Sequence, residues 1–316
     1  MTRILLSSAL VSIAMSFLSL PAHAGLFRAY VSSTGNDANA CTLQAPCRLL
    51  PAALAAVNDG GEIWMLDSAN YNTATVNIVQ SVSILAVPGA VGSVLAVNGP
   101  AIYILGNPNL TVTVALRNLV IVPLPGGNGT HGVDVGANST VTIENSLIAN
   151  LPSDGVAVFG AGNIAIANTI IRNNGLFGVE LQQGATADIS GTELLNNRYG
   201  AVVLISNGAT TTTATLSDST IYGGSGSEGV YAITYSAGDK ASIFVTRCTI
   251  QNTYFALDSE TSGGGSALVA VSNSMITNNN YAWYQSGAGS VIRSLGNNHL
   301  IDNTTQSGTL TTTATQ

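Results

Sequence analysis

The sequence predicts an all-β chain that folds as a right-handed parallel β-helix, a solenoid of about ten coils with a short capping helix near its N-terminus. Two observations support this prediction: a motif that returns about every 25 residues, and paired apolar positions before most copies of that motif. The hand follows because connections between parallel strands are almost always right-handed. Independent amphipathic helices are the alternative, but the Asn, Gly and Thr content of every copy disfavours them.

The repeat is clearest between Asn168 and Asn174, where the chain reads Asn-Thr-Ile-Ile-Arg-Asn-Asn. With Ile171 as the reference, the equivalent aliphatic residues of the other copies are Ile121, Ile148, Leu194, Ile221, Ile250, Ile276 and Leu300. Further apolar residues precede most of them by seven and five positions, as Ile164 and Ile166 do here, and this alternation predicts a short strand with one inward face. Coils stacked about 4.8 Å apart would bury a core that one coil cannot close.

Two columns of Asn mark the predicted bends. The first, two residues after the reference, contains Asn150, Asn173, Asn196, Asn252, Asn278 and then Asp302. The second, three residues before the reference, contains Asn118, Asn145, Asn168, Asn273 and Asn297. Asn tolerates the left-handed backbone of a sharp bend, and stacked Asn side chains can pair amide to amide. We therefore expect a bend backbone at Asn173, with amide contacts to Asn150 and Asn196.

Residues 1–24 have the layout of a cleavable secretory signal: one basic residue, an apolar run, and Ala22-His23-Ala24 just before Gly25. A retained membrane anchor is the alternative, but the apolar run is short for a span and no basic patch follows it. We expect a secreted protein, extracellular or at the cell surface, with the periplasm as another location. No other segment is a candidate membrane span.

The mature chain is predicted to consist of three parts. Residues 25–61 form an N-terminal loop and capping helix, 62–302 the parallel β-helix, and 303–316 a Thr-rich C-terminal tail. The helix is expected between Arg48 and Val57, where apolar residues recur at helical spacing before the stop signal Asn-Asp-Gly-Gly. From 62 to 105, short apolar runs suggest two or three further coils, without a fixed register.

The charge balance limits the partners. Sixteen acidic residues against nine basic ones give a formal charge of −7, and such a surface repels phosphate backbones and anionic lipid heads. Nucleic acid is therefore excluded as a partner. We expect a monomer that contacts an extracellular polysaccharide or a cell surface.

Cysteine use agrees with export. Cys41 and Cys47 lie in a Pro-containing loop and are predicted to form one disulfide, with a metal half-site or two free thiols as the alternatives. Cys248 occupies the place that other copies fill with Ser146, Thr169, Thr192, Ser219 and Ser274. It is therefore predicted to be a small buried residue and not a nucleophile.

Several stretches resemble the opening and the last coils of secreted bacterial proteins of the pectin-lyase-like superfamily. They are Tyr30–Asp37, Cys41, Pro46–Arg48 and Gly60–Ile63 at the start, and Ser-Asn-Ser-Met-Ile and Leu-Gly-Asn-Asn between 272 and 298. The resemblance covers nearly all of the mature chain and implies the right-handed β-helix fold. Many members of the superfamily have no assigned chemistry, so a specific activity does not follow.

The catalytic signatures of the superfamily's better-known enzymes are missing. Polygalacturonase-like hydrolases carry Asn-x-Asp, Asp-Asp, Gly-His-Gly and Arg-x-Lys; this chain has Thr130-His131-Gly132 in the third place and no Arg two residues before Lys240. The Arg-x-Pro-x-x-Arg run of pectate lyases and the Asp-Pro-His of alginate epimerases are also absent. No catalytic residue of the superfamily can be transferred to this chain.

One candidate site lies on the strand that follows each bend, where most copies pass through a Gly. The side chain two residues past that Gly is expected to face outward, and this column reads Asp134, Ala157, Glu180, Val202 and Tyr231. The residue before the Gly adds His131, Asp154, Phe177, Tyr199 and Glu228, while Arg172 and Arg198 stand on the bend. The candidate catalytic residues are Asp134, Asp154, Glu180, His131, Arg172 and Arg198.

The backbones of Asp134 and Glu180, two coils apart, are expected to lie about 10 Å from each other. Two such carboxylates can act as acid and base on a polysaccharide, or hold calcium. The alternative is a solvated face, on which the acids only keep the protein soluble. Apart from calcium, the sequence predicts no metal or cofactor.

The later coils replace acids with aromatic rings. Tyr231, Tyr254, Tyr281 and Trp283 are the candidate binding residues, because flat rings cover the C–H faces of sugars. The alternative is that several of these rings fill the core. We therefore expect a secreted protein that binds extracellular polysaccharide or a cell surface without catalysis. The alternatives are a lyase or hydrolase of an acidic polysaccharide, pectate-lyase-like or polygalacturonase-like, and a structural or adhesin-like surface module.

Overall fold

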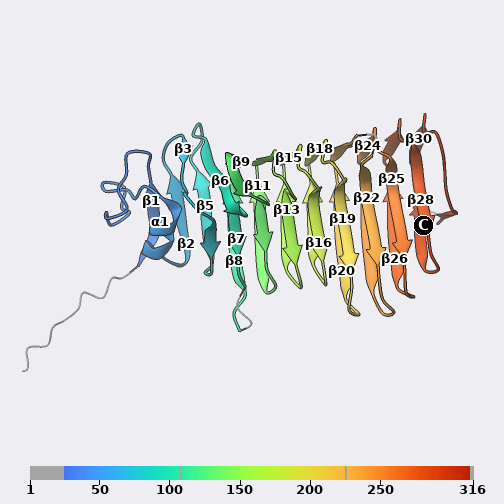
Figure 1. Ribbon diagram of the computed structural model, residues 1–316, viewed down its shortest axis with the longest axis horizontal. Helices are drawn as coiled ribbons and strands as arrows, with labels where there is room; N and C mark the ends of the chain where they lie inside the picture. The colour runs from blue at the N-terminus through green and yellow to red at the C-terminus, as the bar shows by residue number, and fades with distance from the viewer. Residues whose placement is uncertain (1–24, 107–108, 225, 314–316) are drawn as a thin grey trace, which may run out of the picture.

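The computed structural model describes residues 25–106, 109–224 and 226–313; the predicted signal segment, 1–24, lies outside them. These residues form a parallel β-solenoid of about nine turns, with a single α-helix near the N-terminus (Figure 1). Each turn adds one strand to each of three parallel sheets, here called A, B and C. The all-β solenoid predicted from the repeat is therefore confirmed.

Sheet A has twelve strands and extends from one end of the stack to the other. They are β1 (Leu26–Val31), β2 (Val57–Met65), β5 (Val82–Ala86), β8 (Val112–Arg117), β11 (Ser139–Glu144), β14 (Asn163–Ala167), β17 (Thr186–Ser190), β20 (Thr211–Ser217), β23 (Lys240–Thr246), β26 (Ser266–Ser272), β29 (Ser290–Ser294) and β31 (Leu310–Thr312).

Sheet B has ten strands, most of them short, and contains the reference residues of the repeat. They are β3 (Ala69–Asn70), β6 (Gly92–Gly99), β9 (Leu119–Gly129), β12 (Leu147–Ala149), β15 (Ile170–Arg172), β18 (Glu193–Leu195), β21 (Thr220–Tyr222), β24 (Thr249–Gln251), β27 (Met275–Thr277) and β30 (His299–Ile301).

Sheet C has nine strands and carries the candidate site. They are β4 (Val76–Ile78), β7 (Ile102–Ile104), β10 (Val133–Val135), β13 (Val156–Phe159), β16 (Phe177–Gln182), β19 (Gly200–Ser206), β22 (Glu228–Thr234), β25 (Phe255–Thr261) and β28 (Tyr281–Ser286).

The predicted register is confirmed in sheet B, where the reference residues stack directly on one another. Ile148 pairs with Ile171, Ile171 with Leu194, and the column continues in the same way to Leu300. Ile166 and Ile171 are fully buried, and Ile164 is nearly so. The stack therefore closes the continuous core that no coil could form alone. Before residue 105, where no register could be predicted, Ile63 pairs with Ile84 and Ile84 with Leu116.

The capping helix is α1 (Leu50–Ala56), with Pro51 in its first turn. It buries Leu50, Ala53 and Leu54 and packs against the first strands of the stack. The predicted stop at residues 58–61 is already part of β2, which begins at Val57 directly after the helix. The helix covers the open end of the core, as expected for a solenoid terminus.

The Asn columns form the bends as predicted. Asn150, Asn173 and Asn196 have φ values of 63°, 56° and 52°, and the second column, including Asn145 and Asn168, is left-handed too. Asn173 Nδ2 donates to Asn150 Oδ1 at 3.3 Å. Within the described part of the chain, however, no hydrogen bond joins Asn173 to Asn196, so this half of the expectation is wrong.

A buried ladder follows one residue later. Asn174 Nδ2 donates to Asn197 Oδ1 at 2.9 Å, and Asn197 Nδ2 donates to the Ile171 carbonyl at 3.1 Å. Both side chains are buried, so these bonds satisfy groups that would otherwise be stranded in the core. Asn173 faces outward, where water competes with amide pairing.

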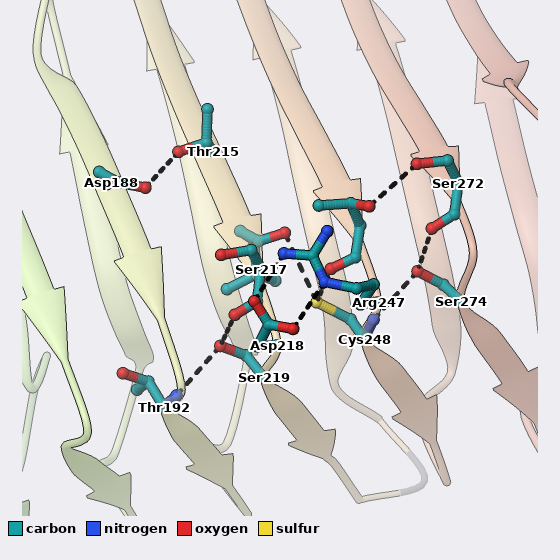
Figure 2. A network of polar contacts seen from close by, with 12 residues as sticks. Asp188, Thr192, Thr215, Ser217, Asp218, Ser219, Arg247, Cys248, Ser272 and Ser274 are labelled. Atoms are coloured by element: carbon teal, nitrogen blue, oxygen red, sulfur yellow. Dashed lines mark hydrogen bonds and ion pairs between the residues drawn. The ribbon is translucent and has the colours of Figure 1, made fainter.

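A second ladder of small polar residues includes Cys248 (Figure 2). The Thr192 amide donates to Ser219 Oγ at 3.1 Å, and the Cys248 amide donates to Ser274 Oγ at the same distance. Cys248 is buried and free, and burial raises the pKa of its thiol. The prediction of a small buried residue that is not a nucleophile agrees with this environment.

Both ends of the described part of the chain are held against the stack. Cys41 and Cys47 form the predicted disulfide beside β1. At the other end, the Ala282 amide donates to the Thr305 carbonyl at 2.9 Å, and β31 pairs with β29. The described part of the predicted Thr-rich tail, 303–313, thus lies against the last strands. No described helix has the length and apolar character needed to cross a membrane.

Candidate functional site

The candidate residues meet on the outer face of sheet C. Strand pairing places one outward column along this face: Tyr103, Asp134, Ala157, Glu180, Val203, Tyr231, Asp258 and Tyr284. Asp134 and Glu180 are two strands apart, as expected.

Sequence reasoning placed Val202 in this column, and that is wrong. Val202 pairs with Val179 and Val230 and is buried in the core, whereas Val203 takes the outward place. Gly200 pairs with Phe177 and not with Gly178, so the Gly of this coil stands one residue earlier than in its neighbours. For the same reason Tyr199 lies outside the column of His131 and Asp154.

The first group, here called the His cluster, consists of His131, Asp134, Asp154 and Glu180. His131 Nδ1 lies 3.1 Å from Asp134 Oδ1, and His131 Nε2 lies 3.4 Å from Asp154 Oδ2. Asp134 Oδ1 has no aligned hydrogen bond, so its contact with His131 is a charge pair. Asp154 is only 1% exposed and also accepts a bond from the Phe177 amide at 2.8 Å. The histidine thus lies between two carboxylates.

Burial and charge oppose each other at His131. Burial by itself would lower the pKa of the imidazole, but its interactions with Asp134 and Asp154 outweigh that effect and raise the pKa to about 10. His131 is therefore an imidazolium at neutral pH, and it balances part of the carboxylate charge.

Glu180 is the member of the His cluster suited to exchange a proton. Burial raises the pKa of its carboxyl to about 7, with a further contribution from Asp154, against the opposing effects of Gln182 and His131. Gln182 Nε2 donates to Glu180 Oε1 at 2.5 Å. A carboxyl with this pKa is partly protonated at neutral pH, as a general acid requires.

The two candidate arginines do not join this cluster. Arg172 ends β15 in sheet B, and Arg198 stands on the bend after β18, with its guanidinium 5.4 Å from the centre of the Tyr199 ring. None of the ion pairs between described residues includes either of them. His131 therefore supplies the positive charge that was expected from arginine.

A second group, here called the acid cluster, consists of Glu228, Asp258 and Glu260, with Tyr231 beside them. Tyr231 Oη donates to Glu260 Oε2 at 2.8 Å. Asp258 is 1% exposed, and its Oδ1, like Oε2 of Glu228, is buried without a hydrogen-bond partner. Burial first, and the neighbouring carboxylates second, raise the pKa of Glu228 to about 7 and that of Asp258 to about 9. Burial likewise raises the pKa of Tyr231.

Sequence reasoning included Glu228 but missed Asp258 and Glu260. The pattern used to find the outward column required a Gly, and in this coil Ala256 stands in that place. Asp258 pairs directly with Tyr231, so alignment on the inward residues Val230 and Leu257 would have found it.

Four rings beyond the acid cluster, here called the aromatic cluster, are Tyr254, Phe255, Tyr281 and Tyr284. The centre of the Phe255 ring lies 4.6 Å from those of Tyr254 and Tyr284, and 5.0 Å from that of Tyr281. A groove of about 400 Å³ runs beside Tyr254, lined by Asn and Thr residues of the bend and by Asp302. Two binding candidates, Tyr254 and Tyr281, thus belong to one ring cluster.

Trp283 does not lie on this surface. It pairs with Leu257 in the inward column, is 7% exposed and packs in the core. Its ring offers no face to a ligand, so the alternative interpretation of a core ring applies to Trp283. Tyr231 is half-buried, with its hydroxyl bonded to Glu260.

Metal binding gains no support from the geometry. Among residues 25–106, 109–224 and 226–313, no group of three or more His, Cys, Asp or Glu side chains is arranged so that it could hold a metal ion. The calcium site allowed by the sequence stays an untested prediction.

Comparison with known proteins gives a family and a fold. The model of a family described as "Right handed beta helix region" matches residues 63–238. A search of curated proteins finds no match. Among solved structures, pectate lyase Pel9A has a TM-score of 0.60 at 15% identity, covering 89% of this chain and 78% of its own. XylC in complex with xylose has a TM-score of 0.55 at 9% identity, covering 86% and 75%. At such low identities the likeness is one of fold alone.

Proposed function

The chain belongs to the right-handed β-helix family, and we propose that it is a secreted protein that binds an extracellular polysaccharide along the outer face of sheet C. The observation that carries this proposal is the order of groups on that face. The His cluster, the acid cluster and the aromatic cluster follow one another along the stack, from β10 to β28. A linear ligand lying along the stack would meet all three.

The chemistry of this face suits sugars. Carboxylates, amides and hydroxyls pair with sugar hydroxyls, and the rings of the aromatic cluster cover apolar sugar faces. Two similar folds support the same class of ligand, since one is a pectate lyase and the other was solved with xylose. Export is supported by the Cys41–Cys47 disulfide, because such bonds persist in oxidising compartments.

A glycan array followed by titration calorimetry on the best ligand tests the proposal. Replacing Tyr281 and Tyr284 together by Ala should weaken binding at least about tenfold, because stacking area is lost. Tyr222→Ala is the matched control, since Tyr222 is an exposed ring on sheet B. Failure of every oligosaccharide to bind, or equal losses in both variants, would refute the proposal.

Catalysis by the His cluster is a second candidate function, favoured by the partly protonated Glu180. On this hypothesis Glu180 is the general acid, and cleavage slows above about pH 7 as it loses its proton. Release of reducing ends from a polysaccharide would reveal the activity. Glu180→Gln should abolish it, whereas Glu193→Gln, an exposed change on β18, should not. Activity unaffected by Glu180→Gln would rule out this role.

A further inference from the structure

The acid cluster has three carboxylates and no positive partner. Glu228 stands on β22, and Asp258 and Glu260 stand on the adjacent β25. No ion pair between described side chains includes any of the three. Tyr231 satisfies one oxygen of Glu260, but Asp258 Oδ1 and Glu228 Oε2 have no hydrogen-bond partner. Since buried polar groups in native proteins are nearly always paired, these oxygens require a donor from outside the chain.

We propose that the acid cluster binds the ammonium group of an amino sugar, so that the polysaccharide recognised by sheet C is one with free amines. This inference rests on the proposed function and specifies its ligand class. An ammonium group has three donors and no acceptor. It can therefore donate to an unpaired oxygen of Asp258 or of Glu228.

The surrounding rings favour an organic cation over a metal ion. Phe255 pairs with Glu228 across β22 and β25, and Tyr284 pairs with Asp258 across β25 and β28. The centres of these two rings are 4.6 Å apart. Aromatic faces attract ammonium groups, and they also cover the ring of the sugar that carries the amine. Within the described residues, the carboxylates do not converge as a metal site requires.

Charge disfavours a polymer of uronic acids. The chain has a formal charge of −7, and the acid cluster would meet a ligand carboxylate with like charge. Arg172 and Arg198, which were candidate catalytic residues in the sequence, lie away from the acid cluster, on or next to sheet B. A polymer with protonated amines is positive, so the negative charge of the protein attracts it.

The acid cluster lowers its own charge by holding protons. With a pKa of about 9, Asp258 is neutral at pH 7, and Glu228, with a pKa of about 7, is half protonated. The ionisable groups that face Asp258 are Glu228, Glu260, Tyr231 and, from β28, Tyr284. A bound ammonium favours the carboxylate forms and lowers these pKa values. Binding at pH 7 should therefore release a proton into the buffer.

Calorimetric titration at pH 7 with a glucosamine tetramer and its N-acetylated counterpart tests the inference. The amine form should bind at least about tenfold more tightly, which corresponds to the energy of one charged contact. Comparison of two buffers with different ionisation enthalpies should show release of about one proton. Asp258→Asn and Glu228→Gln should each remove the preference for the amine, so that the two tetramers bind with similar affinity. Glu193→Gln is the control for charge alone.

The possible failures can be told apart. Equal affinity for the two tetramers, with both weakened by the Tyr281 and Tyr284 changes, would overturn the ammonium site and leave the polysaccharide proposal intact. Binding of no oligosaccharide from the array would overturn both. A rise in melting temperature with Ca²⁺ that Asp258→Asn abolishes would assign the acid cluster to a metal and overturn the ammonium site.

Discussion

The two carboxylate clusters on sheet C differ in how their charge is balanced. In the His cluster, an imidazolium lies between Asp134 and Asp154, at 3.1 and 3.4 Å. In the acid cluster, the only side-chain partner that the described residues give the three carboxylates is the hydroxyl of Tyr231, which donates to Glu260. The same face of one sheet thus holds one cluster with a cation of the chain among its carboxylates and one without. The cluster without a cation is the better place to look for a ligand, because a ligand adds most where groups are unpaired.

Protons reduce the charge of both clusters, but in different ways. The pKa of His131 is raised to about 10, so His131 gains a proton and becomes positive. The pKa of Asp258 is raised to about 9, so Asp258 keeps a proton and becomes neutral. The first cluster is therefore charged and paired at neutral pH, whereas in the second Asp258 is neutral and Glu228 is half protonated.

The largest effect is expected from removing the cation of the His cluster. His131→Ala leaves Asp134 and the buried Asp154 without a positive partner, which should lower the free energy of unfolding by about 3 kcal/mol. Urea unfolding at pH 7 measures the loss. The matched control is His299→Ala on the exposed face of β30, with an expected change below about 0.5 kcal/mol. Equal stability of parent and His131→Ala would show that the two carboxylates need no cation.

The pH dependence follows from the direction of the His131 shift. Its folded pKa, about 10, lies above the ordinary value of 6.5. The stabilisation is therefore complete below pH 6.5 and is lost as the pH rises through about 10. The difference between parent and His131→Ala should shrink over the same range in the urea experiment. A difference that stays constant from pH 6 to pH 10 would contradict the charge pair.

A smaller effect of opposite sign is expected in the acid cluster. Asp258→Asn replaces a buried carboxyl that has no cation beside it by a neutral group of the same shape, which should stabilise the protein by about 2 kcal/mol at pH 8. The folded pKa of Asp258 is raised from 3.8 to about 9, so the parent loses stability as the pH rises across that interval. Melting temperatures at pH 5 and pH 8 should show a gain that grows with pH. Destabilisation at pH 8 would mean that Asp258 has a partner in the folded chain.

The stack could be predicted from the sequence because its signals are local and repeated. In each coil, alternating apolar residues indicate the strand, and an Asn such as Asn150 or Asn173 indicates the bend. The predicted register therefore does not shift where one of these signals is missing. Coils without the signal were aligned less well. Because Gly200 stands one residue earlier than the Gly of other coils, Val202 was assigned to the wrong column. Because Ala256 stands where other coils have Gly, Asp258 was missed.

The chemistry of the site could be predicted only in part. The column that brings Asp134 and Glu180 to one face follows from strand periodicity, and the structure confirms that arrangement. Protonation does not follow from a single coil, because the pKa of Asp258 depends on Glu228, in the preceding coil. Likewise, the choice between surface and core for Trp283 depends on pairing with Leu257 in the preceding coil.

The smallest effect tests how far Tyr231 completes the acid cluster. Tyr231→Phe removes the hydroxyl that donates to Glu260 Oε2 at 2.8 Å, while it keeps the ring, and should cost about 1 kcal/mol at pH 7. Tyr235→Phe is the control, because Tyr235 is an exposed ring in the same coil. If the hydroxyl is the cluster's internal partner, Tyr231→Phe and Glu260→Gln should be non-additive in a double-mutant cycle measured by urea unfolding. Additive losses would show that Glu260 is stabilised by water alone. The contrast between the two clusters would then be sharper still, since no side chain would stabilise any of the three carboxylates of the acid cluster.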